Sequence, residues 1–234
     1  MPIDSKKLKD LQAQYGGLIG GSVRAKISEG SSVLVIGVGG MGCKTVNQIA
    51  KEYKEHFEDT SSLSLLAIDT NQEELNKIQI INGGYVDAQD MFPLYDPSVK
   101  DALKVPRSDY VKSFVSDDVP QHDITETGAN GVRCVGRVML CASPKYGILL
   151  ETLRNRIHNM PGSKKQIIFI AGISGGTGSG TFIDIAYMLG YLTKNMGNTN
   201  VFGVFYMPDV QKNETESKAR QTFGRALKKT VMLP

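Results

Sequence analysis

The sequence predicts a doubly wound α/β fold, in which helices cover both faces of a mostly parallel β-sheet. Apolar runs at 33–36, 63–68, 167–171 and 201–206 lack alternating polar residues, which is typical of strands buried on both faces. Two of these runs lead through glycine-rich turns into segments whose apolar residues recur at helical spacing. This alternation of buried strand and amphipathic helix is the pattern of a parallel α/β sheet.

Composition and charge limit the classes of function. The 234 residues, 41% hydrophobic and 22% charged, suffice for one domain with a substantial core or two small ones. A net charge of +3 without a basic stripe does not indicate a nucleic-acid partner. Three sparse cysteines without a Cys-x-x-Cys pair favour reduced, buried thiols. The polar first residues and the absence of a membrane-length apolar run predict a cytoplasmic protein with no membrane segment.

Residues 1–30 are polar and are predicted to form an extension ahead of a nucleotide-binding domain at 31–210. The first apolar run is followed by Gly-Val-Gly-Gly-Met-Gly at 37–42 and then by a predicted helix. A G-x-G-x-x-G pattern between strand and helix is the context of a dinucleotide site. Asp69, at the end of the next strand, stands where such a site binds the ribose hydroxyls. An NAD(P)-dependent oxidoreductase is therefore one hypothesis.

The middle of the chain carries weaker signals. Residues 77–80 are predicted to form a short third strand, and 82–125 an irregular insertion with a short helix near 97–103. Asp117, Asp118, His122 and Asp123 lack a recognised metal-ligand spacing, and no chemistry is assigned to them. Helices are predicted at 132–142 and 147–160.

The glycine-rich turn at 172–181 is the most informative stretch. It joins the strand at 167–171 to a predicted helix, and its hydroxyls at Thr177, Ser179 and Thr181 can donate hydrogen bonds. Backbone N–H groups of such a turn, together with the helix dipole, bind anions, so a phosphate site is predicted. Thr181 stands where a P-loop requires lysine, which excludes a Walker A motif. The alternative is a glycine-rich surface turn without a ligand.

The last strand, 201–206, is followed at 217–229 by a predicted amphipathic helix with Ala219, Phe223, Ala226 and Leu227 on one side. Residues 211–234 are predicted to be a C-terminal helical segment that is truncated.

The glycine turns resemble those of the tubulin/FtsZ superfamily. The run from Ser174 to Gly180 matches that family's phosphate loop without a departure. The loop at 37–42 with the following Val46 and Asn47 resembles the family's first nucleotide loop. Residues 67–71 resemble the second loop, with Asp69 in place of an asparagine and Asn71 in place of an aspartate. Residues 128–137 resemble the third loop, and 207–210 stand in the position of the fifth.

The resemblance implies a GTP (or GDP) ligand, with Mg²⁺ bound through the nucleotide phosphates. Gly37, Gly39, Gly40, Met41 and Gly42 would face the α- and β-phosphates, with Asp69, Thr70 and Asn71 nearby. Ala129, Asn130 and Gly131 would contact the γ-phosphate, and Arg137 a phosphate or a neighbouring subunit or, equally, only solvent. Ser174, Gly175, Gly176, Thr177, Gly178, Ser179 and Gly180 would wrap the phosphate tail, and Asp209 would border the ribose.

The family's guanine-reading asparagine and catalytic acidic loop lie beyond the segment that corresponds to this chain. The expectation is a GTP-binding cytoskeletal protein whose longer form polymerises head to tail, and whose 234 residues bind nucleotide but hydrolyse it slowly. A nucleotide-free tubulin-like capping or interaction module is the third hypothesis, beside the oxidoreductase.

Overall fold

The computed structural model describes residues 30–117 and 128–207. The predictions made for most of the N-terminal extension, for Asp118, His122 and Asp123, for Asp209 and for the helix at 217–229 lie outside the described residues.

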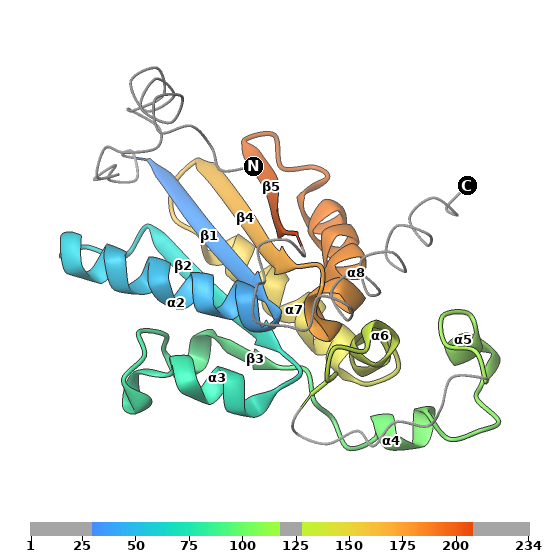
Figure 1. Cartoon of the computed structure of the whole chain (residues 1–234). Coiled ribbons are helices and arrows are strands. Elements are labelled where there is room, and N and C mark those ends of the chain that lie inside the picture. The colour runs from blue at the N-terminus through green and yellow to red at the C-terminus, as the bar shows by residue number, and fades with distance from the viewer. Residues whose placement is uncertain (1–29, 118–127, 208–234) are drawn as a thin grey trace, which may run out of the picture.

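A five-stranded sheet forms the centre of the fold, and its strand order is β3-β2-β1-β4-β5 (Figure 1). Every strand pair in the described part of the chain is parallel. β1 is the central strand, and its residue Val35 lies opposite Leu65 of β2 on one side and Ile168 of β4 on the other. The strands are β1 (Ser31–Val38), β2 (Leu63–Asp69), β3 (Met91–Pro93), β4 (Lys164–Gly172) and β5 (Thr199–Tyr206).

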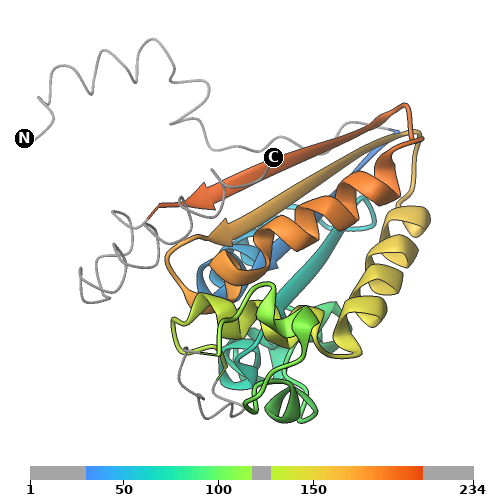
Figure 2. The same cartoon turned by 90° about the vertical axis from the view of Figure 1, so that its right-hand side faces the viewer.

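Helices cover both faces of the sheet, which confirms the doubly wound prediction. Figures 1 and 2 show α2 and α3 on one face and α7 and α8 on the other. Alternate residues of β1 divide between two cores, because Val35 packs with α2 whereas Leu34 and Ile36 pack with α7 and α8. The helices are α2 (Gly39–His56), α3 (Gln72–Ile78), α6 (Arg133–Cys141), α7 (Lys145–Asn159) and α8 (Gly176–Thr193).

The predicted third strand at 77–80 is wrong. Residues 72–78 form helix α3, and the third strand is β3, in the segment predicted to be irregular. The helix forms because the Asn71 side chain accepts hydrogen bonds from the N–H groups of Glu73 and Glu74, and these acids also suit the helix dipole. A short apolar run in the sequence does not by itself distinguish the end of a helix from a strand.

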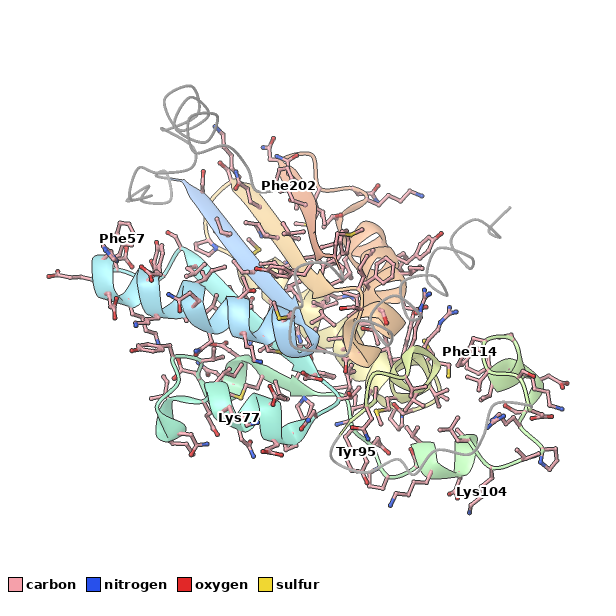
Figure 3. All side chains as sticks on the ribbon, in the orientation of Figure 1. Phe57, Lys77, Tyr95, Lys104, Phe114 and Phe202 are labelled. Atoms are coloured by element: carbon pink, nitrogen blue, oxygen red, sulfur yellow. The ribbon has the colours of Figure 1, made fainter. Side chains whose placement is uncertain are left out.

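The insertion at 82–125 is partly regular. Beside β3 it holds the short helices η2 (Ala88–Asp90), α4 (Val99–Ala102) and α5 (Asp109–Lys112), while η1 (Ile80–Asn82) leads into it. Val99 and Phe114 pack against Val135 and Met139 of α6 in a small separate core. Figure 3 shows Phe114 between α5 and α6. Asp117 forms an ion pair with Lys112 at 3.1 Å and accepts a hydrogen bond from the backbone N–H of Arg107 at 3.1 Å.

β3 pairs only with the last part of β2, from Ala67 to Asp69. The earlier part of that β2 edge is covered by Arg156 of α7. Its guanidinium donates to the carbonyl of Leu65 at 2.8 Å and to Asp90 at 2.7 Å. A side chain therefore replaces a neighbouring strand at this edge.

The parallel topology brings the turns at 37–42, 69–71 and 172–176 to one edge of the sheet, where the strands end. Among the residues that the structure describes, no helix is at once long and apolar enough to span a bilayer.

Candidate functional site

Three helices begin at the carboxyl edge of the sheet without a side-chain cap. The N-cap residues of α2, α6 and α8 are Val38, Val132 and Gly175, and none of them makes a side-chain cap hydrogen bond. None of these helices has an acidic residue in its first turn. The first N–H groups of a helix have no partner within the helix, and the dipole makes this end attractive to anions. The neighbouring α3, by contrast, is capped by Asn71.

Glycines bring these three helix starts into backbone contact. A Cβ on Gly39 would lie 3.0 Å from the amide nitrogen of Gly178, and Gly39 has a φ of +72° that favours glycine. A Cβ on Gly176 would lie 2.9 Å from the amide nitrogen of Val132. The start of α8 therefore touches both the α2 loop and the α6 loop.

Other glycines of the predicted site serve packing. A Cβ on Gly37 would collide with the carbonyl of Gly42, and one on Gly42 would lie 2.6 Å from the carbonyl oxygen of Ile170. On α8, Gly178 lies against the carbonyl of Gly172, and Gly180 against that of Arg133. These four glycines let the loops and helices approach one another closely.

In the loops that lead into α2, α6 and α8, three glycines have space beside them. Among the described residues, a Cβ on Gly131 or Gly175 would meet nothing within 4 Å, and one on Gly40 would meet only a carboxylate oxygen of Glu74 at 3.9 Å. Each of the three uncapped loops thus contributes one glycine whose backbone a large group can approach. Asn130, next to Gly131, is exposed and has a left-handed φ of 47°.

A chain of buried hydrogen bonds joins the loops behind these glycines. The amide of Ala129 donates to the Thr70 hydroxyl at 3.0 Å, and Thr177 donates to Asp69 Oδ1 at 3.0 Å. The hydroxyl oxygens of Thr70 and Thr177 lie 2.6 Å apart. Because each hydroxyl has one hydrogen, Thr70 donates to Thr177 while Thr177 donates to the carboxylate. The chain links the 128–131 loop, the end of β2 and the start of α8.

The Asp69 side chain takes part in this chain of hydrogen bonds. It is 3% exposed, and its Oδ1 also accepts the amide of Asn71 at 3.2 Å. Burial raises the pKa of the Asp69 carboxyl, and the hydrogen bonds from Asn71 and Thr177 partly oppose that rise. A carboxylate held in this way is not presented to a ribose, which disfavours the oxidoreductase hypothesis.

The remaining hydroxyls of the glycine turn also make hydrogen bonds within the fold. Ser179 donates to the carbonyl of Gly175, and Thr181 donates to that of Thr177 at 2.8 Å. Ser174 differs, because its side-chain oxygen is buried and has no hydrogen-bond partner among the described residues. An unpartnered buried hydroxyl beside uncapped amides fits a site that receives a polar group.

The Arg137 side chain binds within the fold. Its guanidinium donates to Asp184 of α8 at 3.1 Å and lies over the ring of Phe114, 5.1 Å from its centroid. Arg137 therefore fastens α6 to α8 and to the segment after α5. The same α6 face carries Arg133, whose Nη1 is buried and has no hydrogen-bond partner in the part of the chain that the structure describes.

Three residues near the first loop had no part in the sequence-based site. Thr45, one turn after Met41, donates to the carbonyl of Met41 at 2.9 Å and lies 3.0 Å from the Tyr206 hydroxyl. This contact ties the end of β5 to the start of α2. Glu74, near Gly40, forms a 3.9 Å ion pair with Lys44. Tyr206 could have been predicted near this site, because it ends a strand and the carboxyl ends of parallel strands meet at this edge of the sheet.

The fold is that of a doubly wound, Rossmann-like α/β protein whose glycine-rich loops meet at the carboxyl edge of the sheet. The family model described as "Tubulin like" matches residues 34–228. The chain therefore belongs to the tubulin-like family.

The fold is also similar to a solved structure, CetZ from Methanosaeta thermophila strain DSM 6194. The TM-score is 0.51 and the sequence identity 17%, over 85% of this chain and 42% of that one. The chain thus spans less than half the length of this structural relative. A comparison with curated proteins finds no match.

Proposed function

We propose that the chain binds GTP or GDP at the carboxyl edge of its sheet, with Mg²⁺ bound through the phosphates. The observation that carries the proposal is the meeting of three uncapped helix N-termini, each beside a glycine with open space, at Gly40, Gly131 and Gly175. Anions are stabilised by such N-termini, and a triphosphate has enough charged groups to engage more than one of them.

In this proposal the residues divide into two groups. The ligand would contact Gly40, Met41, Asn130, Gly131 and Gly175, and the buried hydroxyl of Ser174 would form a hydrogen bond with it. The buried residues of the predicted site hold the loops in place: Gly37, Gly39, Gly42, Asp69, Thr70, Ala129, Gly176, Thr177, Gly178, Ser179 and Gly180. Mg²⁺ would neutralise phosphate charge, which the carboxylate of Glu74 near Gly40 would otherwise repel.

Guanine, rather than adenine, is proposed from family membership alone. Head-to-tail assembly into filaments is proposed for a longer form of the protein on the same ground. The cytoplasmic location stays a prediction.

A thermal-shift experiment with GTP, ATP and NAD, each with Mg²⁺, tests the binding. A ligand at 100 times its Kd stabilises the native state by about 2.7 kcal/mol. We expect GTP to raise the melting temperature more than ATP, and NAD to have no effect. Stabilisation by NAD alone would favour the oxidoreductase hypothesis. No change in melting temperature with any of the ligands would favour the hypothesis of a tubulin-like interaction module that binds no nucleotide.

A variant pair links the response to the proposed site. Gly175→Glu places a negative charge at the start of α8, where the φ of −80° accepts any residue and a Cβ meets nothing within 4 Å. Gly147→Glu is the control, because Gly147 is an exposed glycine of α7 that also has open space. We expect Gly175→Glu to abolish the GTP response and Gly147→Glu to retain it. If GTP raised the melting temperature of both variants equally, the nucleotide would not bind beside Gly175.

A further inference from the structure

A carboxylate lies close to one of the three uncapped helix starts. A Cβ on Gly40, in the first turn of α2, would lie 3.9 Å from Oε2 of Glu74, which belongs to α3. Figure 1 shows α3 beside α2, and the two helices are in contact. The Glu74 side chain is 28% exposed, so water screens its charge only in part. The positive end of the α2 dipole is therefore already close to one negative charge.

Two lysines hold the Glu74 carboxylate in this position. Lys77 Nζ donates to Oε1 at 2.7 Å, and Lys44 Nζ lies 3.9 Å from Oε2. The second distance is too long for a hydrogen bond, so the oxygen nearer to Gly40 can still accept one. The Lys44 and Lys77 side chains are 66% and 57% exposed, and such exposed cations offset the carboxylate charge incompletely.

The other polar side chains of the loop before α3 are bound within the fold. Asp69 accepts hydrogen bonds from Thr177 and from the amide of Asn71. The Asn71 side chain accepts from the first amides of α3. Burial is the main cause of the raised pKa of Asp69, and the charge of Glu74 adds to that rise. The field of Glu74 therefore reaches into the candidate site.

The starts of α6 and α8 differ from the start of α2. Neither helix has an acidic residue in its first turn, and among the described residues a Cβ on Gly131 or Gly175 would meet nothing within 4 Å. A phosphate group can therefore approach these two starts without meeting a carboxylate of the described chain at close range. At the start of α2 the same group would meet Glu74, and like charges at such a distance repel strongly where water is partly excluded.

We propose that Glu74 makes this site select nucleotides that carry a divalent cation over free nucleotides. This inference rests on the proposed nucleotide site and adds the residue that decides which form of the ligand binds. Carboxylate oxygens attract Mg²⁺, so Oε2 favours a nucleotide whose phosphates carry the cation. Without the cation, the same oxygen opposes the phosphates.

Isothermal titration calorimetry of the full-length chain with GDP, in MgCl₂ or in EDTA, measures this selection. We expect the wild-type chain to bind GDP at least about tenfold more weakly in EDTA, because repulsion from one partly buried charge has an effect of this order. Glu74→Gln keeps the length of the side chain and removes its charge. Its Kd values in the two buffers should differ by less than about threefold.

Glu73→Gln is the matched control. Glu73 lies on the same helix and pairs with the same lysine, Lys77, at 3.3 Å, but its side chain is 72% exposed. We expect this variant to keep the cation dependence of the wild type. A ratio of the two Kd values that is the same for the wild type and Glu74→Gln would overturn the proposal. Thermal unfolding without ligand should be alike in the three proteins, because exposed ion pairs contribute little to stability.

Inorganic triphosphate separates this inference from the proposed nucleotide function, because it carries the phosphate charges without a base or a ribose. It should raise the melting temperature of the wild type only with Mg²⁺, and that of Glu74→Gln with or without Mg²⁺. If this pattern holds while GTP and GDP do not bind, the nucleotide function is wrong and the role of Glu74 stands. If the wild type responds equally with Mg²⁺ and with EDTA, the role of Glu74 is refuted even where GDP binds. If neither protein responds to any phosphate compound, both proposals are refuted.

Discussion

The replacement Thr177→Val removes one hydroxyl from the buried chain that joins the three loops. Valine keeps nearly the shape of threonine, and Thr177 is 7% exposed, so the main change is the loss of hydrogen bonds. Two bonds are lost: the donation to Asp69 at 3.0 Å and the acceptance from Thr70 at 2.6 Å.

The magnitude follows from the kinds of bond. A hydrogen bond to a charged acceptor contributes about 1.5–3 kcal/mol and a neutral one about 1 kcal/mol. Thr177→Val should therefore lower the free energy of unfolding by roughly 2–4 kcal/mol, a large share of the 5–15 kcal/mol typical of a domain. The loss should shrink as the pH falls through the pKa of Asp69 in the variant, because a protonated carboxyl no longer needs the donor as strongly.

Urea unfolding followed by far-UV circular dichroism measures the effect. Thr181→Val is the matched control, since Thr181 is one turn further along α8, is 0% exposed, and donates only to the carbonyl of Thr177 at 2.8 Å. That carbonyl belongs to the helix ladder, so we expect a loss of less than about 1 kcal/mol. If Thr177→Val and Thr181→Val lower the free energy of unfolding by the same amount, the chain of hydrogen bonds does not hold the loops together.

Three further predictions concern other groups. Because burial raises the pKa of Asp69, its negative charge lowers the stability of the native state at neutral pH. Relative to Asp69→Asn, the wild-type protein should therefore gain stability in urea unfolding as the pH falls toward about 4. A difference between the two proteins that does not change with pH would contradict this. Arg156→Met should lower the free energy of unfolding by roughly 1–3 kcal/mol and should make light scattering increase with protein concentration. Arg154→Met is the control, because Arg154 forms an exposed ion pair whose loss should change the stability by less than about 1 kcal/mol. An Arg156 variant that is as stable as the wild type and does not scatter would be evidence that Arg156 does not protect the β2 edge. Burial, with a smaller contribution from Asp184, raises the pKa of the Cys141 thiol to about 11, so its alkylation by iodoacetamide at pH 8 should be slow in the folded chain and fast in urea, as read by mass spectrometry.

The long strands and the glycine turns could be predicted because their signals are local. A run such as 33–36 followed by glycines at 37–42 specifies a buried strand and a tight turn within a dozen residues. β3 could not be predicted, because three residues carry no periodicity and Pro93 argues against a strand. Its pairing with β2 depends on residues more than twenty positions away.

The candidate site divides in the same way. Its glycines were identified from spacing, but their separation into packing and open positions depends on which backbone each one meets in space. The bond between Thr177 and Asp69 joins residues 108 positions apart, and no spacing rule predicts it. The pairing of Arg137 with Asp184 is equally non-local, which is why an outward-facing arginine was an equally good prediction.

The cover that Arg156 provides for β2 has a consequence during protein synthesis. Arg156 and Leu65 are 91 residues apart in the chain, so the β2 edge is made long before the side chain that protects it. A nascent chain that has passed β2 but not α7 exposes an unpaired strand edge, which is prone to pairing with other chains. The ribosome releases elements from the N-terminus at about 5–20 residues per second, so this interval lasts on the order of 5–20 seconds. We therefore expect this interval to be the stage of synthesis at which the chain most depends on chaperones.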